Sequence, residues 1–203
     1  MREKQVNNFA QIHSNWQFVL PPSRPSIQEL ERIKTLLINC DREKPIAILG
    51  STIEFRNLLH FLGFHQIYVF EKNRSFYSWT SSWVTHDVEL EQVVWGDWLQ
   101  TIMKYKNYFQ AVLSDLTSGN VPYNDRKIYY QAIYESLVDG GVFIDKVLTH
   151  CIPHDPLDEL MKKYEQTPIN LQTVNRFSCE VLFCSTLLND GVVDTSYIYN
   201  ILT

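Results

Sequence analysis

Apolar residues recur along the chain in two patterns that alternate with each other. Short apolar runs, which are typical of buried strands, lie at residues 44–51, 66–71, 93–96, 109–115 and 141–148. Between these runs the apolar positions return every three or four residues, which predicts helices. The helices are expected over residues 26–39, 54–63, 124–141 and 155–166. Because strands and helices alternate, the pattern predicts a parallel sheet that is covered by helices on both faces.

Two further apolar runs, residues 178–188 and 195–202, lie near the end of the chain. The turn sequence NDG lies between them, so they are expected to pair antiparallel at one edge of the sheet. All the runs together predict an α/β fold with a mostly parallel, seven-stranded sheet and an antiparallel edge hairpin. Residues 1–40 are expected to form an N-terminal extension with one helix, and residues 41–203 the main domain.

The composition is that of a globular protein. A chain of 203 residues, 45% of them hydrophobic, is long enough to bury a core of its own. The formal net charge of -5 argues against a broad nucleic-acid surface, which needs clustered Lys and Arg. No apolar stretch has the length of a membrane span, and the N-terminus has no signal-peptide core. We therefore expect a cytoplasmic protein that binds a small or neutral ligand, without a membrane or nucleic-acid partner.

The cysteines do not form a metal or disulfide framework. Cys40 and Cys151 lie far apart, and neither they nor the closer pair Cys179 and Cys184 have a zinc-binding spacing. Buried thiols are expected, and no metal.

Several residues that suit an adenosine-containing ligand follow the predicted strands. Ligands of parallel sheets bind outside the carboxyl ends of the strands. The first strand is followed by Gly50, which would let the backbone approach a ligand. Glu71 ends the second strand, where an acid can accept both ribose hydroxyls, and Asp97 follows the third, where an acid can accept the adenine amino group. Asp115 ends the fourth strand. This set predicts a binding site for an adenosine-containing cofactor.

These strand ends resemble those of the class I S-adenosylmethionine-dependent methyltransferases. The closer resemblance is to a branch whose first loop has the pattern LGxTxE, and it rests on RPS at residues 24–26 and on LGSTIEFRNLL, GDWL, AVLSDLTSGNVP and GGVFIDKV. It implies a Rossmann-like three-layer sandwich, S-adenosylmethionine as the cofactor and a small-molecule O, N or S acceptor. The N-terminal segment would then cover the pocket.

The resemblance also implies which residues would hold the cofactor. Gly50, Ser51 and Thr52 would border its methionine part, and Glu71 would bind the ribose. The adenine would be bordered by Gly96, Asp97 and Trp98. The sulfonium would be bordered by Asp115 and Leu116.

Each strand-end residue also has a structural alternative. Gly50 suits an ordinary turn, and Glu71 could be a solvated acid. Asp97 could cap a helix, and Asp115 could end its strand through an Asx-turn. Glu54 either orients the first loop or is a first-turn acid favoured by the helix dipole.

The methyl acceptor is less well indicated. Methyl transfer needs proximity, orientation and, for some acceptors, a base, so no particular catalytic residue is required. The candidates that lie in the N-terminal segment or just after strands are His13, Arg24, Tyr123, Asp145 and His150.

Aromatic residues at near-helical spacing follow the second strand. Phe76, Trp79 and Trp83 could form one apolar helix face, for which core packing is favoured over a stacking platform for a substrate ring.

Three other functions compete with small-molecule methyl transfer. A nicotinamide-dependent oxidoreductase would share the acid at the second strand but needs a GxGxxG loop, whereas LGSTIE has one glycine. A non-catalytic, methyltransferase-like binding or interaction domain would explain the thinned loop. A nucleic-acid methyltransferase is disfavoured because TSGNVPY lacks a contiguous Asn-Pro-Pro-aromatic motif.

Overall fold

The computed structural model describes most of the chain between residues 23 and 181. The described residues are Trp16, Val19, Pro21, 23–147, 157–170, 172–174, 176–178 and 180–181. Contacts divide the chain into two compact units: residues 24–148 form one, and residues 1–23 with 149–203 form the other. The first unit contains a five-stranded sheet.

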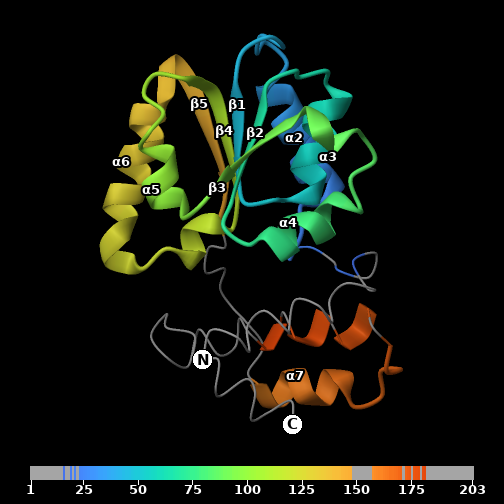
Figure 1. Ribbon diagram of the computed structural model, residues 1–203. Coiled ribbons are helices and arrows are strands. Elements are labelled where there is room, and N and C mark those ends of the chain that lie inside the picture. The colour runs from blue at the N-terminus through green and yellow to red at the C-terminus, as the bar shows by residue number, and fades with distance from the viewer. Residues whose placement is uncertain are drawn as a thin grey trace. The chain divides into compact units, whose positions relative to one another are not determined.

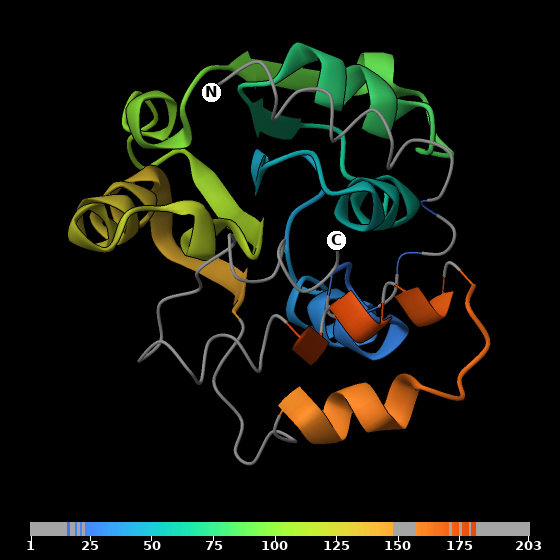
Figure 2. The same cartoon turned by 90° about the horizontal axis from the view of Figure 1, so that it is seen from below.

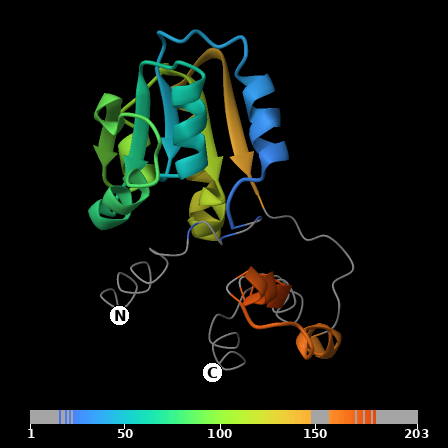
Figure 3. The ribbon, with the colours of Figure 1, turned by 90° about the vertical axis from the view of Figure 1, so that its right-hand side faces the viewer.

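All five strands of this sheet are parallel, as the sequence predicts (Figure 1, Figure 3). The strands are β1 (Ile46–Leu49), β2 (Ile67–Glu71), β3 (Glu91–Trp95), β4 (Phe109–Asp115) and β5 (Leu137–Lys146). Their spatial order is β3-β2-β1-β4-β5. The direction of winding therefore reverses between β1 and β4, which makes their carboxyl ends the topological switch point.

Helices cover both faces of the sheet (Figure 1, Figure 2). One face carries α2 (Ile27–Leu36), α3 (Ile53–Phe61) and α4 (Arg74–Ser81), and the other carries α5 (Trp98–Ile102) and α6 (Arg126–Ser136). Short 3-10 helices lie at Val88–Leu90, Thr117–Asn120 and Tyr123–Asp125.

Successive side chains of a strand point to opposite faces of the sheet, so the core is divided into two clusters, one under each layer of helices. Ile46 and Ile48 of β1 pack with Phe55 of α3 in one buried cluster. The alternate residues Ala47 and Leu49 pack in a second buried cluster with the α5 and α6 side chains. Both faces of the central strands are buried, which is why their sequences are continuous apolar runs.

A capping box fixes the start of α2. The Ser26 hydroxyl accepts a hydrogen bond from the Glu29 backbone N–H at 3.2 Å, and the Ser26 N–H donates to the Glu29 carboxylate at 2.6 Å. The sequence prediction of an N-cap at Ser26 is confirmed.

Ser26→Ala is expected to lower the free energy of unfolding by about 1 kcal/mol, because an N–H of the first turn loses its acceptor. Urea denaturation would measure the loss. Ser75→Ala, at an exposed position of α4, is the matched control. An effect of Ser26→Ala no larger than that of the control would contradict the capping role.

The boundary between α6 and β5 differs from the sequence prediction. The helix predicted over residues 124–141 ends at Ser136, and the following residues belong to β5. Leu137 pairs with Phe109, but the next regular pair is Val142 with Ala111, so extra residues bulge out of the ladder between them. The helix ends because its C-cap residue Leu137 is extended, with a φ of -78° and a ψ of 143°. Gly140, within the bulge, has a φ of +73°, which favours glycine.

The strand predicted over residues 178–188 does not begin where the sequence suggested. Ser178, Glu180 and Val181 are helical. Val181 and Leu160 of α7 (Leu157–Tyr164) are buried in one small cluster, with Phe177 packed against it. An apolar spacing of four, as between residues 177 and 181, suits a helix, and a short apolar run does not distinguish it from a strand. The rest of the predicted hairpin lies outside the described residues.

The described residues include neither a helix that could cross a membrane nor a set of side chains placed to bind a metal. No helix among them is long and apolar enough to cross a membrane. Within the same residues, no group of three His, Cys, Asp or Glu side chains is placed to hold a metal ion. Cys40 is a half-buried free thiol, and the other three cysteines lie outside the described residues.

Candidate functional site

The predicted strand-end residues meet at the carboxyl edge of the sheet, which Figure 2 shows from below. The sheet order makes β1 the neighbour of both β2 and β4, so the residues after these strands lie next to one another. Gly50, Ser51 and Thr52 follow β1 on one side of the switch point, and Asp115 and Leu116 lie on the other. The edge thus brings together the set of residues that the sequence singled out.

The first loop is tied closely to β2. Gly50 has a φ of +88°, which favours glycine, and its N–H donates to the Phe70 carbonyl at 2.9 Å. The Trp98 indole donates to the same carbonyl at 3.0 Å. A Cβ at Gly50 would lie 4.0 Å from the Trp98 ring. Gly50 is therefore a turn glycine, which agrees with the structural alternative given for it above. Trp98 borders the same loop.

Glu71 is buried, which rules out the alternative of a solvated acid. The residue is only 5% exposed to solvent. Oε1 accepts the backbone N–H groups of Lys72 at 2.8 Å and Asn73 at 2.9 Å, and Oε2 accepts the Ser51 hydroxyl at 3.1 Å. A carboxylate offers about four acceptor positions. The described hydrogen bonds fill three of them and leave one on Oε2.

Asp97 caps α5, so its structural alternative is confirmed. Its Oδ1 accepts the Leu99 N–H at 3.0 Å, and the residue is exposed. Gly96, directly before it, has a φ of +140°, and a Cβ there would lie 2.7 Å from the Thr101 methyl. Only glycine fits this turn between β3 and α5.

Asp115 and its successor are held in an unusual geometry. The Asp115 side chain is 8% exposed, and its Oδ1 makes no hydrogen bond, so this oxygen forms no Asx-turn. Leu116 has a φ of +59°, which costs an L-residue about 1–2 kcal/mol. Its N–H donates to the Lys146 carbonyl at 3.0 Å. Strained backbone of this kind gathers at functional sites.

Asp115 is surrounded by charged side chains from α2, α3, β5 and the loop before α2. Together with Asp115, these residues form the Lys146 cluster, which consists of Arg24, Glu29, Glu54, Asp115 and Lys146. The Lys146 ammonium lies 3.6 Å from both Glu29 and Asp115 and donates to the Arg24 carbonyl at 2.9 Å. The Arg24 guanidinium lies 2.8 Å from Glu54. The segment around Arg24 is thereby joined to α3 and to the ends of β4 and β5.

Sequence reasoning recognised only part of this cluster. Arg24, Glu54 and Asp115 were candidates, but Glu29 and Lys146 were not. A signal for most of the cluster was present in the motif segments on which the resemblance rests. One cluster residue lies in each of RPS, LGSTIE, VLSD and FIDKV. Glu54 is a first-turn acid of α3, as one alternative held, and it is also buried against Arg24.

A second buried acid lies at the end of β5. Both carboxylate oxygens of Asp145 are buried without a hydrogen bond, and burial raises the pKa of this group, against a smaller lowering effect of the nearby Ser114 and Ser118 hydroxyls. Ser114 also lies 3.3 Å from the Tyr129 hydroxyl, with which it shares a hydrogen bond. Tyr123, in contrast, is 82% exposed. His13 and His150, the other acceptor candidates, lie outside the described residues.

The aromatic segment after β2 behaves as core. Phe76 and Trp79 lie on α4, with ring centroids 5.4 Å apart, and Trp79 is buried. Trp83 follows the end of the helix and is half-buried. The preference for core packing over a substrate platform is therefore supported at Trp79.

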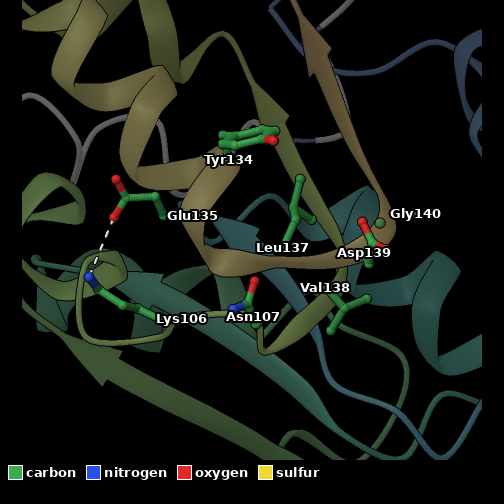
Figure 4. A pocket seen from close by; sticks show the side chains of 9 residues that line it. Lys106, Asn107, Tyr134, Glu135, Leu137, Val138, Asp139 and Gly140 are labelled. Atoms are coloured by element: carbon green, nitrogen blue, oxygen red, sulfur yellow. Dashed lines mark ion pairs between the residues drawn. The ribbon is translucent and has the colours of Figure 1, made fainter.

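A cavity of about 610 Å³ opens at the opposite, amino edge of the sheet (Figure 4). It is lined by Lys106, Asn107, Tyr134, Glu135, Leu137, Val138, Asp139, Gly140 and Gly141. Lys106 and Glu135 form an ion pair of 3.7 Å at its rim. None of the predicted site residues borders this cavity. Because ligands of parallel sheets bind at the carboxyl ends of the strands, we place the candidate site at the carboxyl edge and not in this cavity.

Comparison with known proteins identifies the fold. No model of a known protein family matches the sequence, and no curated protein matches it. Among solved structures, the chain is similar to the glycopeptide N-methyltransferase MtfA complexed with S-adenosylmethionine, at 17% identity and a TM-score of 0.50. That match covers 63% of this chain and 58% of MtfA. The chain has a Rossmann-like α/β fold.

Two further matches show the range of proteins that share this fold. Phosphoethanolamine N-methyltransferase 2 from Haemonchus contortus, in complex with S-adenosylmethionine, matches at 14% identity and a TM-score of 0.53, over 82% of this chain and 39% of that one. A protein from Rhodobacter sphaeroides, provisionally assigned to the zinc-dependent alcohol dehydrogenases, matches at 18% identity and a TM-score of 0.54, over 76% and 58%. The match thus covers less than two thirds of the length of each of these proteins. Likeness at these identities concerns the fold and not the activity.

Proposed function

We propose that this chain binds S-adenosylmethionine at the carboxyl edge of its sheet and transfers the methyl group to an O, N or S atom of a small molecule. The observation that carries the proposal is the Glu71 carboxylate. It is buried at the end of β2, held by Ser51 and two backbone N–H groups, and keeps one acceptor position for a ligand. A ribose diol is a donor of the kind that this position requires.

The other strand ends have complementary roles in the proposal. Gly50, Ser51 and Thr52 would border the methionine part. Gly96, Asp97 and Trp98 would border the adenine, and Asp115 and Leu116 the sulfonium. The bound cofactor would supply an electrophilic methyl group, while the chain's residues orient the acceptor and exclude water. The structurally similar proteins that were solved with S-adenosylmethionine support the choice of cofactor.

Glu71→Gln is expected to weaken S-adenosylhomocysteine binding by roughly tenfold to a hundredfold, the effect of losing a hydrogen bond to a charged group. Calorimetric titration of the purified chain with S-adenosylmethionine and S-adenosylhomocysteine would measure it. Glu89→Gln, at an exposed acid, is the control. Absence of binding to the folded wild-type chain would overturn the proposal.

A second variant separates a role at the adenine from the helix cap. Asp97→Ser keeps a hydroxyl that can accept the Leu99 N–H but removes the carboxylate. If Asp97 recognises the adenine amino group, this variant binds S-adenosylhomocysteine more weakly and melts at an unchanged temperature. An unchanged affinity would restrict Asp97 to capping.

Two alternatives are tested by the same titration. Binding of a nicotinamide dinucleotide in place of S-adenosylhomocysteine would favour an oxidoreductase, although the first loop has the single glycine Gly50. The thinned first loop, which has the single glycine Gly50, favours a non-catalytic binding domain. Cofactor binding without methyl transfer in a screen of acceptors would support that second function.

A further inference from the structure

Asp115 is a buried carboxylate whose hydrogen bonding is incomplete. Its side chain is 8% exposed, and Oδ1 is buried without a hydrogen bond. The nearest described cation, the Lys146 ammonium, lies 3.6 Å away, which is beyond hydrogen-bond distance. That ammonium is also close to Glu29 and donates to the Arg24 carbonyl. An ionised oxygen in such a place is stabilised by a ligand that brings a donor and a positive charge.

The described charges around Asp115 are two carboxylates and two cations, so an ionised Asp115 gives its cluster one negative charge in excess. Glu54 on α3 and Glu29 on α2 face it together with Lys146 on β5, and Arg24 pairs with Glu54. The Lys146 cluster therefore contains three carboxylates and two cations. Burial raises the pKa of Asp115 to about 6, against the attraction of Lys146 and assisted by repulsion from Glu54 and Glu29. A cation at Asp115 would relieve this repulsion, whereas an anionic acceptor would increase it.

We propose that Asp115 binds an ammonium group of the methyl acceptor, so that the substrate of this chain is an amine. The inference rests on the proposed function, because Asp115 lies at the switch point where the cofactor's reacting group would be placed. It narrows the O, N or S acceptor to nitrogen and assigns the residue that recognises it.

The transfer balances with Asp115 as the proton acceptor. The carboxylate takes one proton from the ammonium, which frees the nitrogen lone pair. The N–C bond then forms as the S–C bond of the cofactor breaks, and the electron pair of that bond remains on sulfur. The product leaves as a methylated ammonium, and Asp115 returns its proton to water.

Sinefungin provides a binding test that needs no acceptor. In this cofactor analogue an amine-bearing carbon replaces the methyl-bearing sulfur, so a cationic amine lies where the reaction occurs, whereas S-adenosylhomocysteine has none there. The wild-type chain is expected to bind sinefungin about tenfold more tightly than S-adenosylhomocysteine, the effect of one charge-assisted hydrogen bond. Calorimetric titration with each compound would measure the ratio.

Asp115→Asn should abolish this preference, so that the ratio of the two affinities falls to about one, since the amide is neutral and of similar size. Asp139→Asn, an exposed position at the amino edge, is the matched control and should keep the preference. In the wild-type chain the preference should also decline as the pH falls from about 8 to about 5, because Asp115 becomes protonated on the way. Circular dichroism would verify that each variant is folded.

The outcomes separate this inference from the proposed function. If the folded wild-type chain binds neither compound, the proposed function fails. If it binds both equally, or if Asp115→Asn keeps the preference for sinefungin, the amine inference fails while the cofactor site stands. If Asp115→Asn weakens both compounds alike, Asp115 contacts a part that they share, and the inference also fails. If the variant equally abolishes a wild-type preference for S-adenosylmethionine over S-adenosylhomocysteine, Asp115 contacts the positive charge of the cofactor itself, and the inference fails as well.

Discussion

Arg56→Met is expected to lower the free energy of unfolding by about 3–5 kcal/mol, because it leaves a buried carboxylate without its main partner. The Arg56 side chain is 0% exposed, and its guanidinium forms a bidentate pair with Glu91, with atoms 2.7 Å apart at the shortest contact. It also donates to Thr80 at 3.0 Å and Ser81 at 2.8 Å. The pair connects α3 with the start of β3. Urea denaturation followed by circular dichroism would measure the loss.

A double variant tests the stated cause. Arg56→Met with Glu91→Gln removes both charges and is expected to recover part of the lost stability, since an uncompensated charge is no longer buried. If the double variant is as unstable as the sum of the two single variants, the loss comes from packing and not from the charge.

The pH dependence of this pair follows from Glu91. Burial raises its pKa, but hydrogen bonds from His60 and Arg56 outweigh burial and hold the pKa below the usual 4.5. A lowered pKa in the folded state means that ionised Glu91 contributes stability above pH 4.5, and that this contribution is lost as the pH falls through the lower value. Arg56→Met should weaken this acid dependence.

Gly96→Ala is expected to cost about 1–3 kcal/mol from the backbone alone, because φ is +140°. A further cost of about 1–3 kcal/mol is expected from the new Cβ, which would lie 2.7 Å from the Thr101 methyl. Both Gly96 and Thr101 belong to the turn and helix that position Asp97 and Trp98, so cofactor affinity should fall as well. Thermal denaturation and titration with S-adenosylhomocysteine would measure the two losses.

Gly96→Ala combined with Thr101→Ser separates the two causes. Serine keeps the hydroxyl that donates to the Asp97 carbonyl at 2.8 Å but removes the methyl group. The double variant should recover the part of the loss due to crowding and keep the part due to φ. No recovery would assign the whole effect to the backbone.

The local pattern of residues predicted the parallel core well. The five apolar runs became the five strands, and the cap at Ser26 was read correctly. These features depend on short-range periodicity and capping, which neighbouring residues carry by themselves. The end of α6 was predicted too late, because the bulge that starts β5 is stabilised by pairing with a distant strand.

The sequence also placed the strand-end residues at one edge, but it did not determine what they do there. Glu71 and Asp97 are both acids after strands, yet Glu71 is buried among donors and Asp97 is an exposed cap. Burial and the direction of a hydrogen bond depend on the loops that surround each residue, and no local pattern encodes them.

The sequence by itself determined the order of the five parallel strands along the chain, the glycines at the turns and the candidate acids of the site. Only the tertiary structure decided that Arg56 pairs with Glu91 and that Lys146 joins Asp115 to the segment around Arg24. It also decided that residues 178, 180 and 181 are helical. Apolar periodicity reports which face of an element is buried, whereas charge pairing joins residues that are far apart in the chain and depends on how the elements pack.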